Sequence, residues 1–290
     1  MQKNRAPYPF ETIATAISFS PRMDALIGES VQLAKKFHAK LVFIHIGNKA
    51  ESRKEELHKI IERLADGVSF TIACRTGEPV ETILQVCKEN VVDLLVIGAL
   101  EKETLLKYYF GSIARNICRK AKCSVLLLTQ PSMSERKFDS IVINAKDNPK
   151  TSFTIETASY FAKAYNINQL QIVVEHQLSP ALYSSLPVDI NEDEAQKLKE
   201  DLQDSDILEI KKILKKVNTN GLKLKVDYIS GKPGFAINNY TREHNFDLLV
   251  VNSPDEKLNI LDRIFTNDFE YLLENLPSNM LIVHSRINKN

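Results

Sequence analysis

A strand end and a helix start, each marked by a glycine, lie in the stretch 96–116, VIGALEKETLLKYYFGSIARN, and together they can bind a phosphate. Gly98 ends an apolar run, where glycine can take a positive φ angle and lets a ligand approach the backbone. Gly111 precedes Ser112, which can cap a helix whose free N–H groups and positive dipole end point outward. The simpler interpretation is that Gly-Ser is how many helices begin. The segment between the glycines, KETLLKYY, is expected to be helical in part.

A carboxylate lies within this stretch. Glu101 stands between the two glycines, where a phosphate site least tolerates a negative charge. At about 4 Å and an effective dielectric constant near 20, two like charges repel by about 4 kcal/mol. A metal ion, or a side chain turned outward, would weaken that repulsion. The stretch is therefore either a working nucleotide site or the remnant of one.

Other catalytic patterns are absent from the sequence. It contains no GxGxxG, Walker-type GxxxxGK, HExxH or GxSxG motif, and its four cysteines form no CxxC pair and no metal spacing. His45 and His176 end predicted strands, where a hydrogen-bonded structural role is expected rather than that of a base. Because no base–nucleophile pair is visible, we predict that the protein is not an enzyme and holds no metal.

Composition narrows the class of partner. The 290 residues carry a net charge of +1, so no general field attracts nucleic acid or an anionic membrane. Arg115 and Arg119 share one helix face, expected to be solvated or, alternatively, to contact an anion or a partner. No apolar run approaches the ~20 residues of a membrane span, and the start, MQKNRAPYPF, lacks the apolar core of a signal peptide. The sequence therefore predicts a cytoplasmic protein that binds neither nucleic acid nor membrane.

The sequence contains an internal repeat. FETIATAISFSP at 10–21 matches FDSIVINAKDNP at 138–149, and DLLV at 93–96 recurs at 247–250. Each copy alternates short apolar runs with amphipathic helical stretches, which favours buried parallel strands joined by helical crossovers. We predict an α/β protein of two tandem Rossmann-like domains, 1–132 and 133–290, each an open five-stranded parallel sheet flanked by helices.

The second copy is longer than the first around 177–205, LSPALYSSLPVDINEDEAQKLKEDLQDSD. This insertion begins rich in Pro and Ser and becomes acidic. It is interpreted as a solvated loop running into a helix or as a flap over the second domain's crevice, since long connections are often functional. Its acidity disfavours a flap that covers a phosphate.

The stretch 93–128 resembles the carboxyl-terminal part of a universal stress protein (UspA-like) domain. ATP-binding members of that family carry Gly, two residues, Gly, nine residues, and then Gly-Ser or Gly-Thr. The corresponding positions here are Gly98, 101, Gly111 and Ser112, so the spacing is intact. KCSVLLL is similar to the family's closing strand. The resemblance covers essentially the full chain, twice, and implies a tandem universal stress protein.

Departures from the family pattern fall at the expected site. Glu101 replaces the second glycine, and Ser18 replaces an acid that in the family lies near the adenosine moiety. In the second copy Lys146 takes the place of Ser18, and the counterparts of the motif positions are Asn252, Asp255, Phe265 and Thr266. The resemblance therefore implies that ATP binding is lost in the second domain. In the first domain it leaves a residual nucleotide crevice of Ser18, Gly98, Gly111 and Ser112.

Three functions follow from the resemblance and these departures. The favoured one is a non-catalytic stress-response protein that binds partner proteins or a small ligand and needs no cofactor. The alternative is a regulatory switch that binds ATP or AMP in domain 1, with slow hydrolysis. The third, an enzyme of the wider adenine-nucleotide α/β superfamily, lacks a base–nucleophile pair.

The same resemblance bears on assembly. Single domains of the family commonly pair through their last strands. SVLLLTQ and NMLIVHS are therefore expected to pair within one chain as an intramolecular pseudo-dimer, which protects two sheet edges. A homodimer would need another surface.

Overall fold

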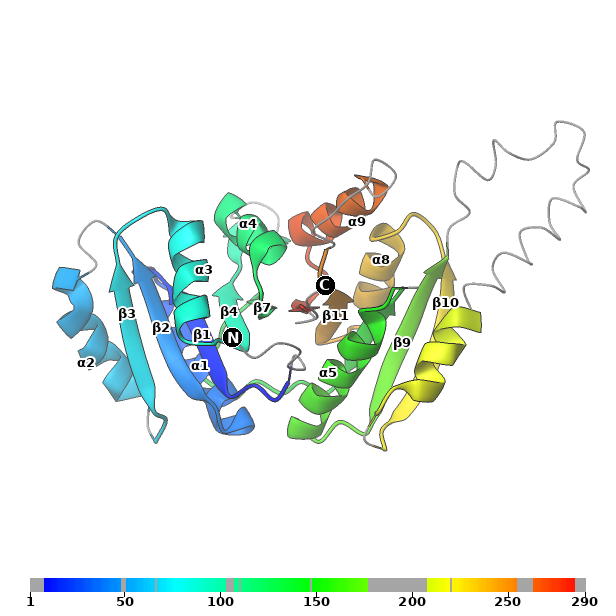
Figure 1. Cartoon of the computed structure of the whole chain (residues 1–290), viewed down its shortest axis with the longest axis horizontal. Helices are drawn as coiled ribbons and strands as arrows, with labels where there is room; N and C mark the ends of the chain where they lie inside the picture. The colour runs from blue at the N-terminus through cyan, green and yellow to red at the C-terminus, as the bar shows by residue number, and fades with distance from the viewer. Residues whose placement is uncertain are drawn as a thin grey trace, which may run out of the picture.

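The computed structural model describes residues 8–47, 51–65, 67–102, 107–109, 111–146, 148–176, 208–219, 221–254 and 263–284. Ten strands form one continuous sheet in the order β10-β9-β8-β11-β12-β7-β4-β1-β2-β3. The five strands that precede residue 130 lie in one half of the sheet and the other five in the other half, as Figure 1 shows. The α/β class and the five parallel strands predicted for each copy are confirmed. The boundary at 132/133 stays a prediction, and the insertion at 177–205 lies outside the described residues.

The elements of the first half alternate strand and helix. In chain order they are β1 Thr12–Ile17, α1 Met23–Phe37, β2 Lys40–Ile46, the short 3-10 helix Glu51–Arg53, α2 Lys54–Leu64, β3 Phe70–Arg75, α3 Pro79–Glu89, β4 Leu94–Gly98, β5 Leu100–Lys102, β6 Lys107–Tyr109, α4 Ser112–Lys120 and β7 Ser124–Leu128. The second half repeats this plan with β8 Ile141–Ala145, α5 Thr151–Ala164, β9 Gln169–His176, a helix over 208–216, β10 Lys223–Ser230, α8 Phe235–Glu243, β11 Leu248–Asn252, α9 Arg263–Glu274 and β12 Asn279–Val283.

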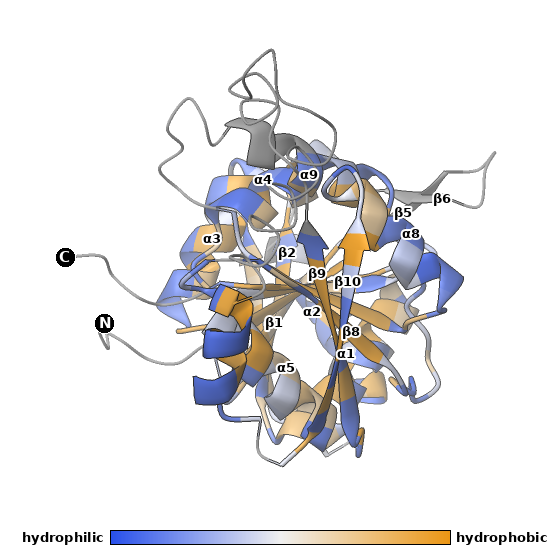
Figure 2. Cartoon of the chain, turned by 90° about the vertical axis from the view of Figure 1, so that its right-hand side faces the viewer, coloured by the Kyte–Doolittle hydropathy of each residue, from blue (hydrophilic) through white to orange (hydrophobic). Residues whose placement is uncertain are grey.

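Two helical layers cover the sheet. Helices α1, α2 and α5 pack on one face, and α3, α4, α8 and α9 pack on the other, each over its own cluster of buried apolar side chains. Figure 2 shows the hydrophobic residues concentrated along the strands and on the helix faces that meet them. Within the described residues, no helix is long and apolar enough to cross a membrane. The four cysteines are free thiols buried in these layers.

Local sequence explains how a typical helix forms. Pro79 opens α3, where its missing N–H costs nothing, and the carboxylate of Glu78 accepts the N–H of Glu81 as a cap. Buried Ile83 and Val86 then follow at helical spacing toward the sheet. The helix predicted there is confirmed.

The segment between Gly98 and Gly111 differs from the prediction. Instead of a partial helix, β5 and β6 form an antiparallel pair in which Glu101 lies opposite Tyr108. The run Tyr108-Tyr109 favours a strand, because aromatic side chains suit a pleated backbone. The residues between the two strands lie outside the described part of the chain.

The two halves meet through β7 and β12, the one antiparallel pair of the large sheet, in which Leu281 lies opposite Leu126. This is the pairing of closing strands that the sequence predicts. At one end of the seam, buried Asn279 accepts bonds from the N–H and hydroxyl of Thr129 at 3.1 and 3.2 Å. Its Nδ2 donates to the carbonyl of Asp247 at 2.9 Å.

Aromatic rings reinforce the seam on the α1 and α5 face. Phe37 of α1 packs against Tyr160 and Phe161 of α5, with ring centroids 5.3 Å apart in both pairs. Phe10 joins the same cluster, 5.1 Å from Phe37 and 5.3 Å from Tyr160. Each such pair adds about 0.5–1.5 kcal/mol beyond its buried area, so the aromatic cluster holds the halves together independently of the strands.

The segment that links the halves is fixed to α1. Glu29, 1% exposed, forms an ion pair with Arg136 and accepts the N–H of Ser132 at 3.0 Å. Met133 lies over Gly28, where a Cβ atom would come within 3.1 Å of its sulfur. This linker, which contains Ser132, Met133 and Arg136, therefore packs on the first half of the molecule.

We expect the seam bond of Asn279 to contribute measurably to stability. Asn279→Ala leaves the Thr129 N–H and the Asp247 carbonyl unpaired, which should lower the free energy of unfolding by about 2–3 kcal/mol. Ser124 is the matched control: it occupies the equivalent place at the other end of the seam, but its buried hydroxyl has no partner among the described residues. Ser124→Ala should change stability by less than about 0.5 kcal/mol. Urea denaturation of both variants measures the difference, and equal losses would contradict this account.

Candidate functional site

The predicted crevice of the first half lies at the ends of β1 and β4. These strands are neighbours in the sheet, and the chain leaves β1 toward β2 on the other side, so the order reverses between them. Ligands of open α/β sheets bind at such a point. Ser18 directly follows β1 and is exposed, and Gly98 is the last residue of β4. The fold therefore brings these two predicted site residues to adjacent strand ends.

Gly98 does not have the backbone that we expected. It is extended in β4 and is not among the glycines with a positive φ angle. A Cβ atom there would lie 3.5 Å from a methyl group of Leu26 and 3.7 Å from the ring of Pro131. The space on that side of Gly98 is thus taken by α1 and the linker, which corrects the prediction that its conformation opens the backbone to a ligand.

The start of α4 also differs in detail. Gly111, with φ −63° and ψ 170°, is the cap residue, and Ser112 is the first helical residue, exposed and without a capping bond. The prediction that Ser112 caps α4 is therefore wrong by one position. Because Gly111 has no side chain, the cap residue offers no side-chain acceptor to the first N–H groups of α4, and these are groups that can bind an anion.

Glu101 lies in β5. Its backbone is set by the pairing with Tyr108, but its side chain lies outside the described atoms. The predicted repulsion between this carboxylate and a phosphate stays a prediction.

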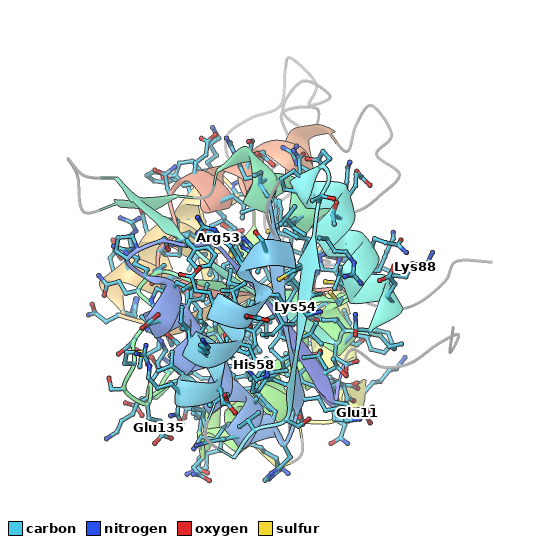
Figure 3. The ribbon with its side chains drawn as sticks, turned by 90° about the vertical axis from the view of Figure 1, so that its left-hand side faces the viewer. Glu11, Arg53, Lys54, His58, Lys88 and Glu135 are labelled. Atoms are coloured by element: carbon cyan, nitrogen blue, oxygen red, sulfur yellow. The ribbon has the colours of Figure 1, made fainter. Side chains whose placement is uncertain are left out.

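An aromatic ring and a guanidinium group close the other side of the crevice. The Arg53 guanidinium lies 4.4 Å from the ring centroid of Phe19, at the head of α2 beyond Lys54 and His58 in Figure 3. The His45 ring is perpendicular to that of Phe19, with ring centroids 5.2 Å apart, and its Nδ1 lies 3.2 Å from the carbonyl oxygen of Ile17. His45 is a hydrogen-bonded structural residue as predicted. Sequence reasoning missed Phe19 and Arg53, because no spacing links the two and only the β1–β2 pairing brings their segments together.

In the second half, the equivalent strand ends are filled by the chain itself on the α5 side. Asn252, the counterpart of Gly98, donates to the hydroxyl of Thr151 at 3.0 Å and accepts from that of Thr154 at 2.5 Å. Lys150 donates to the carbonyls of Ser253 and Pro254, both at 3.1 Å. Side chains thus occupy the volume where a ligand would approach β11.

Helix α9 requires a correction of register. Its buried residues Phe269, Leu272 and Leu273 follow the buried residues of α4, Ala114, Ile117 and Cys118, at a constant offset of 155. The sequence repeat, in which DLLV at 93–96 recurs at 247–250, predicts an offset of 154 residues instead. The structural counterparts of Gly111 and Ser112 are therefore Thr266 and Asn267 rather than Phe265 and Thr266. The side chains of 263–267, and Asp255 altogether, lie outside the described part.

The two arginines of α4 form ion pairs with acids of the second half, while their side chains stay 31% and 47% exposed. Arg115 pairs with Glu274 at 2.9 Å and approaches Glu270 at 3.7 Å, while Arg119 pairs with Glu270 at 2.5 Å. Both acids belong to α9, which lies beside α4 over the seam in Figure 1. The predicted partner of this face is therefore the other half of the same chain.

A buried acid, Asp268, lies at the second crevice. It is 5% exposed, and its Oδ2 lies 3.7 Å from the Nζ of Lys146, the residue in the place of Ser18. Burial raises the pKa of Asp268 above its ordinary value, with a further increase from Glu175, while Lys146 and Lys232 lower it. Asp268 therefore carries its negative charge at a cost to the fold.

The first half of the chain is similar in sequence to known proteins. Residues 47–129 match the model of the Universal stress protein family. Universal stress protein YxiE of Bacillus subtilis is 26% identical over 147 residues, which is 41% of this chain and 99% of that protein. Universal stress protein MJ0531 of Methanocaldococcus jannaschii is 25% identical over 122 residues, 35% of this chain and 72% of that protein.

Solved structures match both halves. A universal stress protein from Archaeoglobus fulgidus has a TM-score of 0.62 at 14% identity, covering 94% of this chain and 96% of its own. A functionally unknown protein from Pseudomonas aeruginosa has a TM-score of 0.69 at 12% identity, covering 94% and 92%. At this identity the likeness concerns the fold alone.

The architecture is thus that of two Rossmann-like α/β units joined through their closing strands. The first half of the chain is similar to universal stress proteins, through the family match at residues 47–129 and the relatives of 26% and 25% identity. The second half has the same strand order but lacks the motif glycines.

We expect Asp268 to make stability depend on pH in a defined direction. Because its pKa is raised in the folded state, its contribution is fully present below the ordinary carboxyl pKa of about 4 and is lost as pH rises through the raised value. Asp268→Asn removes this loss. Urea denaturation should therefore show the variant gaining stability relative to the natural protein between about pH 4 and pH 7.

Asp227 supplies a control of opposite sign. Hydrogen bonding to Tyr240 lowers its pKa, with Lys225 adding to the effect, so its contribution is present at neutral pH and is lost as pH falls. Asp227→Asn should lose stability relative to the natural protein as pH rises from about 2 to 5, because the natural protein gains this contribution between the lowered pKa and the ordinary carboxyl pKa of about 4. A pH-independent difference for Asp268→Asn would show that its charge carries no cost.

Proposed function

We propose that the protein is a non-catalytic stress-response protein of the cytoplasm that acts by binding a protein partner or a small ligand. The main support is the second crevice, where Asn252 and Lys150 are bonded to the chain's own groups, so that half has no room for a nucleotide beside β11. The similarity of residues 47–129 to the Universal stress protein family supports the stress-response role. The net charge of +1 gives no reason to include nucleic acid among the partners, and non-catalytic binding requires no cofactor.

Absence of catalysis is supported by the chemistry of the first crevice. His45 is engaged with the backbone carbonyl of Ile17, and among the described residues no hydrogen bond joins it to Ser18, the hydroxyl at the strand end. A nucleophile needs a base within hydrogen-bond reach. The described residues at β1 and β4 provide no such pair.

A second candidate is a switch that binds ATP or AMP in the first half only. The observation in its favour is the start of α4, where the Gly111 cap leaves N–H groups for an anion. The Arg53 guanidinium adds positive charge across the crevice. Against it stand Glu101 and the packing of Leu26 and Pro131 against Gly98.

Thermal unfolding with and without millimolar Mg-ATP and Mg-AMP separates these candidates. A ligand at a hundred times its dissociation constant stabilises by about 2.7 kcal/mol, a shift of a few degrees for a domain of this size. We expect no shift for the natural protein and a shift for the double variant Glu101→Gly, Ser18→Asp. Lys88→Gln, on the exposed surface of α3, serves as the neutral control.

A higher unfolding temperature of the natural protein with either nucleotide would instead establish the switch and contradict the proposal that nucleotide binding is lost. Light scattering tests assembly in the same samples. We propose that the chain is complete as a monomer through its internal β7–β12 pair. A homodimer in solution would require a further surface.

A further inference from the structure

Three polar side chains of the second half lie where the first half has apolar ones. The equivalences come from strand register, since Ala145 pairs with Val174 as Ile17 pairs with His45, and from the offset of 155 between α4 and α9. The pairs, second half first, are Asn144 and Ala16, Glu175 and Ile46, and Asp268 and Ile113. The first half therefore shows that this fold does not need polar groups at these positions.

Asn144, Glu175 and the backbone of Asp268 lie together between the ends of β8 and β9 and the helices α8 and α9. Glu175 Oε2 accepts the Nδ2 of Asn144 at 2.9 Å, and its Oε1 accepts the N–H groups of Gly234 and Ile237, both at 2.9 Å. Gly234 in turn touches the backbone of Asp268, where a Cβ atom would come within 2.7 Å of the carbonyl oxygen. Glu175 thus occupies the N-terminus of α8 and denies it to an anion.

Two oxygen atoms of this cluster have no hydrogen-bond partner among the described residues: Oδ1 of Asn144 and Oδ2 of Asp268. Their residues are 3% and 5% exposed. The Lys146 ammonium lies 3.7 Å from Asp268 Oδ2, beyond hydrogen-bond distance. A buried polar atom left without a bond destabilises the fold, and the first half avoids that cost with Ala16 and Ile113.

Both atoms without partners are acceptors, and Asp268 and Glu175 bring two carboxylates to this place, with the Lys146 ammonium beside Asp268. Their complement is a group with N–H donors and a positive charge. We propose that the second half binds a small molecule through a protonated primary amino group, seated between Asn144 Oδ1 and Asp268 Oδ2. Lys146, one third exposed at the rim, holds the chain's own ammonium near this seat and competes with the ligand.

This inference rests on the proposed function and deepens it, because it names a chemical class for the small ligand and the place where it binds. It explains why the second half lost the features of a phosphate site and gained acids instead. Glu175 occupies the N-terminus of α8, where an anion would bind, and Asp268 adds a second carboxylate that already lies near the Lys146 ammonium. This place in the second half therefore favours a cation over an anion.

Calorimetric titration with n-butylammonium chloride tests the proposal on the full chain. Tetramethylammonium chloride, a cation without N–H donors, is the control at the same ionic strength. We expect saturable binding of butylammonium alone. Lys146→Ser, which installs the residue of the first half, should tighten binding at least about threefold by removing the internal competitor, whereas a merely structural lysine would leave it unchanged or weaker.

Two variants remove the seat. Asp268→Asn should weaken binding by about tenfold or more, since the charge-assisted bond is lost while the shape is kept. The triple variant Asn144→Ala, Glu175→Ile, Asp268→Ile should abolish it, with circular dichroism to verify the fold. Mg-ATP titration of the same proteins should be unaffected, so the result is independent of the first crevice.

Three outcomes would overturn the proposal. They are equal binding of tetramethylammonium, unchanged affinity in Asp268→Asn, and no saturable heat with either the natural chain or Lys146→Ser. A crystal structure grown with butylammonium that shows only a water bonded to both orphan oxygens would overturn it as well.

Discussion

The antiparallel pairing of β7 and β12 is the constraint on which the rest of the molecule depends. It converts two five-stranded sheets, each with an exposed inner edge, into one sheet of ten strands. The same pairing lays α4 beside α9, so the arginines of one helix meet the acids of the other. On the opposite face it brings α1 and α5 together, where Phe37 and Tyr160 pack. The seam is therefore bonded by backbone, charge and aromatic contact at once.

The two halves share a scaffold but have diverged where ligands of such sheets bind. In the first half the strand ends are flanked by apolar packing, an aromatic ring and a guanidinium group, with the start of α4 left uncapped by any side chain. In the second half, hydrogen bonds of the chain fill the α5 side, and acids line the side of α8 and α9. One duplicated framework thus presents two different chemistries.

Much of the fold could be predicted from sequence, because apolar runs and helical spacing are local properties. All five strands of each copy and the helix at Pro79 follow from such patterns, whereas the pairing of the closing strands was implied by the resemblance to the family. The β5–β6 pair was missed, since a short polar segment carries both helical and strand formers and only the local pairing decides between them. The one-residue shift of α9 was missed because helix register is fixed by which side chains reach the core.

The sequence by itself determined the class of the protein: a repeated α/β pattern, a damaged glycine motif and a resemblance to universal stress proteins. Only the tertiary structure decided what surrounds the motif. Leu26 and Pro131 meet Gly98, Arg53 meets Phe19, and Asn144 meets Glu175, although each pair is separated by tens of residues. The physical reason is that a binding site is made of contacts between strand ends and helices, and parallel sheets bring those together only through long crossovers.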